Sequence, residues 1–270
     1  MFLLCDKRLL SEITKMFDDA IEKDPTPNEE IKKIIRNGQN EEKKDDTIIK
    51  NRVLGFGDFY KNFSNSKQAY DILDILKVNV CPYCNRQYTF TVRDEENEKI
   101  RPQFDHFYPQ AKYPYLGISI YNLVPSCGLC NQRKLDTSPE NFLYPYEESF
   151  EDKGIYFEVS NVVGNLLNQE QIKVSLQPKE NQKEVIKQYN DSYKIELLYN
   201  EHAPYISELL YKNFVFNDDA IKSIYNSYKE LFDSPSELKR LIFGNYDPEN
   251  YNQRPLSKLT NDIMQQLKGK

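Results

Sequence analysis

Two Cys-x-x-Cys pairs, Cys81/Cys84 and Cys127/Cys130, constrain the fold of this chain more than any other feature of its sequence. Tetrahedral zinc requires four ligands, and each pair can supply two thiolates from one tight turn. A shared ion would tie together parts of the chain that are distant in sequence. Gly128 in the second pair helps its turn. We therefore predict one structural Zn²⁺ bound by these four cysteines.

A redox dithiol is the alternative for the first pair, because its letters, CPYC, resemble the dithiol of the glutaredoxins. A glutaredoxin would carry this motif early in a small separate βαβ domain and would have no second pair. The fifth cysteine, Cys5, stands alone, and we interpret it as a small apolar side chain in an N-terminal helix. Five cysteines in 270 residues do not make a disulfide scaffold.

The composition describes a polar globular protein, with 39% hydrophobic residues and a mean hydropathy of -0.74. No stretch approaches the roughly 18 apolar residues that would span a membrane. The opening letters, MFLLCDKRLLSE, reach a charged residue before an apolar signal region can develop. We expect a cytoplasmic protein with no membrane contact.

The charge is distributed unevenly along the chain. The net charge of -6 argues against a polyanionic partner, because phosphate binding is driven by Lys and Arg. Residues 81–134, however, hold seven Lys and Arg against five Asp and Glu, which leaves -8 for the rest of the chain. The segment that contains both cysteine pairs is thus basic, whereas the rest of the chain taken together is acidic.

The periodicity of apolar residues predicts an α+β fold, in which a small core with the cysteine site is flanked by mainly helical segments. The expected helices before the first cysteine pair are 3–36, interrupted at 24–27, and 66–77, with a polar loop at 37–46. Two alternating segments predict a strand hairpin, 154–160 with 171–177. The expected C-terminal helices are 183–189, 203–214, 220–232, 234–243 and 256–268, with Ser234 and Ser257 as helix starts. The predicted regions are 1–77 (helical), 78–145 (core), 146–178 (hairpin connector) and 179–270 (helical).

Between the two pairs the sequence carries groups suited to hydrolysis. Asp105 and His106 are adjacent, Asn122 follows an apolar run, and Asn131 directly follows the last cysteine. A histidine suits a general base, because its ordinary pKa of about 6.5 lies near working pH. Carboxylate and amide oxygens suit a hard ion such as Mg²⁺. Strand alternation would point Asp105 and His106 to opposite faces, so we expect them at a strand's end, where the backbone bends.

The pattern D-H-x-x-P followed by N-L-V-P-x-C-x-x-C-N-x-x-K, within residues 81–134, resembles the HNH endonucleases, whose ββα-metal fold holds one divalent ion. The resemblance implies that Asp105 and Asn131 bind a catalytic Mg²⁺ or Mn²⁺ and that His106 is the general base. It also implies that Asn122 fixes the loop that orients this histidine. Asn131 stands where many members of the family have a third histidine.

Several residues near this motif have a structural alternative. We expect Arg133 and Lys134 to contact phosphate, although they could be solvated helix charges; Lys134 should share a helix face with Asn131. Asn122 could simply stabilise a turn. The only other histidine, His202, is expected to be structural. Five aromatic residues are expected mostly in the core and otherwise in base stacking: Phe104, Phe107, Tyr108, Tyr113 and Tyr115.

The longer segment FDHFYPQAKYPYLGISIYNLVPSC is followed by the hairpin and by a helical tail that ends in RPLSKLTNDI. Over most of the chain this order is more loosely similar to HNH proteins of bacterial anti-phage defence, notably the Septu nuclease and retron-associated relatives. That resemblance implies an ABC-type or AAA-like ATPase partner that docks on residues 1–77 and 179–270. The function that we expect is a metal-dependent endonuclease acting on DNA. The alternatives are a zinc-knuckle nucleic-acid-binding module without catalysis and, less favoured, a redox protein.

Overall fold

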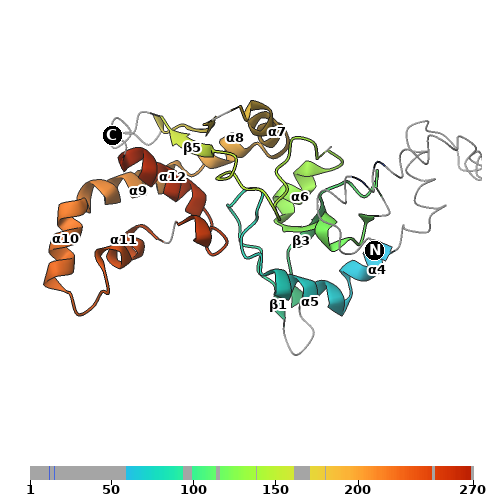
Figure 1. Cartoon of the computed structure of the whole chain (residues 1–270), viewed down its shortest axis with the longest axis horizontal. Helices are drawn as coiled ribbons and strands as arrows, with labels where there is room; N and C mark the ends of the chain where they lie inside the picture. Colours follow the sequence, from blue (N-terminus) through green and yellow to red (C-terminus); the bar gives the residue numbers. More distant parts are fainter. Residues whose placement is uncertain are drawn as a thin grey trace, which may run out of the picture. The chain divides into compact units, whose positions relative to one another are not determined.

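A computed structural model describes residues 12, 15, 59–93, 99–113, 116–137, 139–160, 171–179, 181–244 and 247–268 (Figure 1). The fold is mixed α+β, with many helices and small two-stranded antiparallel sheets. The predicted N-terminal helices at 3–36, the loop at 37–46, Cys5 and Tyr115 lie outside the described residues, except that Glu12 and Lys15 are helical. No helix in the described ranges is both long and apolar enough to cross a membrane.

The chain divides into two compact units. The first unit comprises Met1–Lys77, Phe90–Glu140 and Tyr144–Tyr146. The second unit comprises Val78–Thr89, Asn141–Leu143 and Glu147–Lys270.

The first unit begins, in its described part, with helices α4 (Phe59–Ser64) and α5 (Lys67–Leu76). Helix α5 begins after Ser66 in an extended conformation, and it ends where Lys77 adopts a left-handed backbone and donates its N–H to Leu73 O. The helix predicted at 66–77 is therefore confirmed. Its apolar face packs in a small core of buried residues: Ala69, Leu73, Phe104 and Leu123.

Two strand pairs follow in the first unit. The short strands β1 (Val92–Arg93) and β2 (Lys99–Ile100) pair antiparallel and were not predicted from the sequence. Strand β3 (Gln103–His106) pairs antiparallel with β4 (Leu123–Ser126), which a 3₁₀ turn, η3 (Ile120–Asn122), precedes.

Helix α6 (Gly128–Lys134) begins directly after β4. Cys127 caps it, because its Sγ accepts the N–H of Cys130. The helix thus starts inside the second cysteine pair, at Gly128. The segment from β3 to α6 is a strand, a loop, a second strand and a helix, and all predicted catalytic residues lie on it.

The second unit is built around the antiparallel pair β5 (Ile155–Val159) and β6 (Val174–Pro178), which confirms the predicted strand pairing. A two-stranded sheet leaves N–H groups unpaired on both outer edges, and these need partners when they are buried. Side chains of flanking helices accept them. On the β5 edge, Asp262 accepts the N–H of Phe157 and Gln266 accepts that of Val159. On the β6 edge, Glu196 accepts the N–H of Leu176 and Asn200 accepts that of Val174.

The helices of the second unit largely match the predicted segments. They are α7 (Lys183–Tyr193), α8 (Ile195–Asn200), α9 (Ala203–Val215), α10 (Asp218–Ser227), α11 (Pro235–Phe243) and α12 (Ser257–Lys268), with a 3₁₀ turn η6 (Pro248–Asn250). The short α8 was not predicted, and α10 ends at Ser227 rather than at 232. Ser234 caps α11 by accepting Glu237 N, as expected. Ser257 is instead the first residue of α12, and its hydroxyl donates to Arg254 O.

The loop at 78–89, which carries the first cysteine pair, also belongs to the second unit. Val80 and Tyr88 form an antiparallel bridge across it, and Tyr199 of α8 donates its hydroxyl to Cys84 O at 2.6 Å. Asn85, in a left-handed backbone conformation, contacts the segment that leads into α12. Its contacts there are Tyr251 O, Leu256 N and Lys258 N. The knuckle loop therefore packs against helical residues from the far end of the chain.

Candidate functional site

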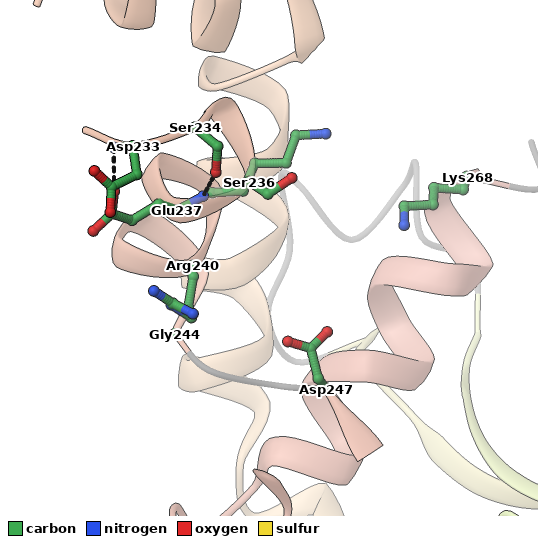
Figure 2. Close-up of a pocket in the computed structure, with 9 residues that line it drawn as sticks. Asp233, Ser234, Ser236, Glu237, Arg240, Gly244, Asp247 and Lys268 are labelled. Carbon is green, nitrogen blue, oxygen red and sulfur yellow. Dashed lines mark hydrogen bonds between the residues drawn. The ribbon is translucent and has the colours of Figure 1, made fainter. Parts of the chain in front are cut away.

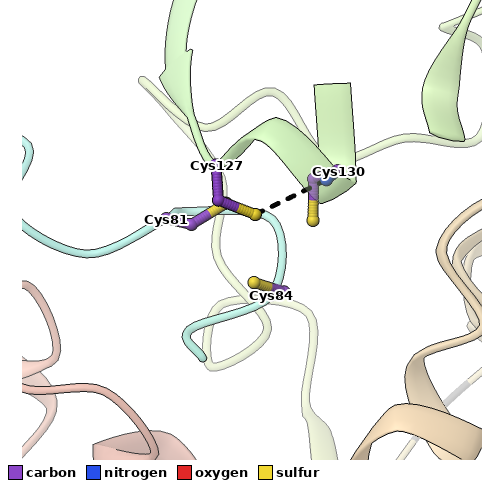
Figure 3. Close-up of side chains that lie close together, drawn as sticks. All are labelled: Cys81, Cys84, Cys127 and Cys130. Atoms are coloured by element: carbon purple, nitrogen blue, oxygen red, sulfur yellow. Dashed lines mark hydrogen bonds between the residues drawn. The ribbon is translucent and has the colours of Figure 1, made fainter. Parts of the chain in front are cut away.

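Four buried cysteines come together as the sequence predicts. The Sγ atoms of Cys81, Cys84, Cys127 and Cys130 all lie within 4.8 Å of one another. Figure 3 shows the four side chains turned toward a common point. Each pair is closed by a backbone hydrogen bond of the same spacing: Asn85 N donates to Cys81 O at 2.8 Å, and Asn131 N donates to Cys127 O at 3.1 Å.

This arrangement fits a structural metal ion such as Zn²⁺. A tetrahedral site with Zn–S bonds of about 2.3 Å places its sulfur atoms about 3.8 Å apart, which is compatible with the observed separation. Each of the four side chains is at most 5% exposed, so no ligand position faces open solvent. Burial and convergence of all four thiols favour a metal-binding cluster over a redox dithiol formed by the first pair alone.

His106 is the last residue of β3, at the strand end where it was expected. Its Nε2 lies 2.9 Å from the carbonyl oxygen of Gly117. A carbonyl can only accept a hydrogen bond, so Nε2 carries the proton and Nδ1 keeps its lone pair. Burial lowers the pKa of His106 below its usual value, which keeps the ring neutral near pH 7. The imidazole also packs edge-to-face against the ring of Tyr60 in α4, with 4.4 Å between the ring centroids. This contact holds the imidazole from the α4 side.

Asn122 organises the loop that follows β3. Its side chain is fully buried, and its Oδ1 accepts the N–H of Tyr108 at 2.7 Å. Its Nδ2 donates to Tyr108 O at 3.1 Å and to Leu116 O at 3.2 Å. The carbonyl next to Leu116, that of Gly117, is the one that holds His106. The amide of Asn122 thus ties together both ends of the loop that holds the histidine.

Asp105 and Lys134 form a buried ion pair. Asp105 is 2% exposed and Lys134 is 0% exposed. The Nζ of Lys134 lies 3.1 Å from Asp105 Oδ2 and 3.4 Å from Oδ1. Burial lowers the pKa of Lys134, and the neighbouring carboxylate opposes this shift. Lys134 is therefore an internal cation in this structure, and its phosphate-contacting role is not favoured by the geometry.

Asn131 and Lys134 share a face of α6, as predicted, and this face lies toward β3. Asn131 donates its Nδ2 to Gln103 Oε1 at 2.8 Å, one turn of helix before the contact of Lys134 with Asp105. Gln103 and Asp105 are alternate residues of the strand and therefore lie on one side of it. Arg133 lies on the exposed side of α6, and phosphate contact by its guanidinium stays a prediction.

Asp105 and His106 leave β3 in opposite directions. Asp105 contacts Lys134 of α6, whereas His106 contacts Tyr60 of α4. This is the direct consequence of strand alternation, because the β3–β4 register runs through both residues. The expectation that a bend would avoid opposite directions was wrong, since the backbone bends only from Phe107 onward. The motif brings Asp105 and Asn131 to the α6 side of the strand, and it places the imidazole at the strand's end beside the loop.

Three neighbours of the motif residues are not predicted by the motif itself: Tyr60, Gln103 and Gly117. Gln103 could have been found, because it is two residues before Asp105 and strand alternation places both on one face. Tyr60 and Gly117 carry no comparable signal, since their contacts with His106 depend on how α4 and the loop pack. Of the predicted aromatic residues, Phe104 and Phe107 are buried, and Phe107 packs against Tyr144 at 5.0 Å between ring centroids.

His202 has a structural partner in the second unit. Its Nε2 accepts the Nε–H of Arg86 at 3.0 Å. Burial, and then the charge of Arg86, lower the pKa of His202, so the ring stays a neutral acceptor. This geometry agrees with the structural role expected for His202.

A polar pocket of about 470 Å³ lies in the second unit and contains none of the predicted site residues (Figure 2). It is lined by Asp233, Ser234, Ser236, Glu237, Lys239, Arg240, Gly244, Asp247 and Lys268. Backbone N–H groups at the N-terminal end of α11 already have hydrogen-bond acceptors within this pocket. The side chain of Ser234 accepts the N–H of Glu237, and the side chain of Glu237 accepts the N–H of Asp233. Its lining of mixed charge points to no ligand class.

No model of a known protein family, no curated protein and no solved structure matches this chain. The buried four-cysteine cluster is the part of the site that could hold a structural metal ion.

Proposed function

We propose that this chain is a metal-dependent endonuclease of the HNH type that hydrolyses phosphodiester bonds of DNA. The observation that carries the proposal is the state of His106: Gly117 O fixes the proton on Nε2, which leaves Nδ1 as a lone-pair acceptor in a neutral ring. A positioned imidazole of this kind can take a proton from an attacking water. The order strand, loop, strand, helix around it supports the same proposal, because it is the order of the ββα-metal fold.

Each motif residue has a part in this reaction. His106 accepts the proton of the water at Nδ1, and Asn122 keeps the loop closed so that Gly117 O stays in place. Asp105 and Asn131, on the α6 side of β3, would hold Mg²⁺ or Mn²⁺ through carboxylate and amide oxygens. This donor set fits a hard divalent ion, which would offset the negative charge that develops on the phosphate. Arg133, exposed on α6, would contact a phosphate oxygen.

The biological setting belongs to the same proposal. We infer a role as effector of an anti-phage system of the Septu or retron type, together with an ATPase. Large apolar side chains are exposed on the segment from α9 to α11, which supports docking of a protein partner. The most exposed of them are Phe214, Leu231 and Leu241.

The test is a cleavage assay with plasmid, linear DNA and total RNA, with Mg²⁺ or Mn²⁺, with and without a candidate ATPase. His106→Ala should lower the cleavage rate by about 10² to 10⁴, which is the usual loss when a general base is removed. His202→Gln is the matched control, because the chain has only two histidines and His202 pairs with Arg86 instead. The control should cleave like the wild type.

Zinc content and circular dichroism show whether each variant is folded. A folded His106→Ala protein that cleaves at the wild-type rate would contradict the proposal. Nucleic-acid binding without cleavage by the wild type would instead favour the alternative, a zinc-knuckle binding module.

A further inference from the structure

Lys134 has more polar contacts than a buried lysine needs for pairing alone. Besides both carboxylate oxygens of Asp105, its Nζ contacts His106 O at 2.6 Å and Phe107 O at 3.1 Å. An ammonium group has three N–H donors, and here four oxygen atoms surround it. The single ammonium therefore holds the last residues of β3 and the first residue after the strand.

Lys134 also stands beside the one carboxylate that the proposed function assigns to the divalent ion. A buried lysine is stable only when an anion compensates its charge, and Asp105 is the carboxylate that does so. A divalent ion at Asp105 would have to share this carboxylate with the ammonium or displace it. Two cations within a few ångströms repel each other strongly in a site that excludes water.

We propose that Lys134 is a positioning residue that acts as the resident cation of Asp105: it orients this carboxylate in the metal-free chain and weakens the binding of the divalent ion. This inference rests on the proposed function, because it takes Asp105 as a ligand of that ion. The ammonium keeps the strand end in place when no divalent ion is bound. In return, a higher concentration of the divalent ion is needed to occupy the site. Removing its charge should therefore strengthen metal binding.

Lys134→Gln removes the positive charge. Its amide still carries N–H donors, on a side chain one atom shorter than that of lysine. Arg133→Gln is the matched control, because it removes a positive charge from the neighbouring, exposed position of α6. Lys134→Arg keeps the charge at the buried position.

The experiment titrates Mn²⁺ against the full-length zinc-loaded proteins and follows the rise in melting temperature and, independently, the Mn²⁺ bound by electron paramagnetic resonance. For Lys134→Gln the Mn²⁺ concentration at half-saturation should fall about tenfold or more, because a repelling charge is lost inside the site. For Arg133→Gln and Lys134→Arg, the Mn²⁺ concentration at half-saturation should stay within about twofold of the wild-type value, since both variants keep a cation beside Asp105. A residue that only supports the fold would lower the melting temperature without moving the Mn²⁺ midpoint.

The outcomes distinguish this inference from the proposed function. If the wild type cleaves DNA but Lys134→Gln binds Mn²⁺ with the wild-type midpoint, the inference on Lys134 is wrong and the nuclease proposal stands. If no protein binds Mn²⁺ or cleaves, both are wrong. If Lys134→Gln folds only when Mn²⁺ is added, the ion replaces the missing charge, as the inference requires. Failure to fold even with Mn²⁺ would overturn it.

Discussion

At the residue scale, the site depends on hydrogen bonds that fix the tautomer of His106 and the loop beside it. Gly117 O determines the tautomer of His106, and the amide of Asn122 holds the loop that carries Gly117. A surface histidine would sample both tautomers, whereas this one is held by a single acceptor. The tautomer of His106 is therefore set by a residue eleven positions away in sequence.

Asn122→Ala should affect both stability and the geometry of the histidine. The substitution removes three hydrogen bonds to buried backbone groups of the loop, so the free energy of unfolding should fall by about 2 to 4 kcal/mol. The measurements are urea unfolding and cleavage rate. Asn65→Ala is the control, because Asn65 is exposed and its side chain donates to the local Lys61 O. Equal effects of the two substitutions would show that the loop does not depend on Asn122.

At the element scale, helices stabilise the edges of a sheet that is too small to stand alone. A two-stranded sheet is marginal in water, and here α8 and α12 each accept N–H groups from one of its strands. On α12, Asp262 accepts Phe157 N at 2.8 Å and also pairs with Lys258 at 2.8 Å. The strand edge is thus closed by a buried carboxylate that carries a partner of opposite charge.

This carboxylate predicts a pH dependence of stability. Burial raises the pKa of Asp262 to about 6, against an effect of Lys258 in the opposite direction. Between about pH 6 and pH 4 the folded chain binds a proton at Asp262 that the unfolded chain does not bind. Protonation of Asp262 therefore stabilises the fold more as the pH falls, and this stabilisation is lost as the pH rises through about 6. Relative to Asp262→Asn, the wild type should gain up to about 3 kcal/mol between pH 7 and pH 4.

The measurement is urea unfolding of both proteins across that pH range. Asp233→Asn removes an exposed carboxylate and controls for the lost charge. A constant difference between the wild type and Asp262→Asn at every pH would show that Asp262 does not titrate in this window.

At the scale of the whole molecule, residues from the far end of the chain are part of the core around the first cysteine pair. Tyr199 donates to Cys84 O, and the segment before α12 contacts Asn85. The C-terminal region was expected to be a docking surface for a partner. Deleting it would remove these contacts as well, so docking is better tested by substitutions at its exposed apolar residues, such as Phe214.

Cys84→Ser should cost folding as well as any activity. A hydroxyl is a poor zinc ligand compared with a thiolate, and a structural zinc site contributes directly to folding. The expected result is less than half an equivalent of bound zinc, with a lower melting temperature than the wild type, measured by metal analysis and thermal unfolding. Ser126→Ala, at a buried polar residue of β4 that is no ligand, is the control. Wild-type protein purified without chelator that contains no zinc would contradict the assignment.

The sequence alone determined the features that depend on short segments. Cysteine spacing indicated the four-thiol cluster, and apolar periodicity located α5, the β5–β6 pair and most C-terminal helices, because these patterns reflect local backbone geometry. The tertiary structure alone decided the partners of the site. Lys134 pairs with Asp105, which is 29 residues away in sequence, and Tyr199 donates a hydrogen bond to Cys84 O, which is 115 residues away. Whether a charge meets solvent or a buried partner depends on packing and desolvation, which no local pattern encodes.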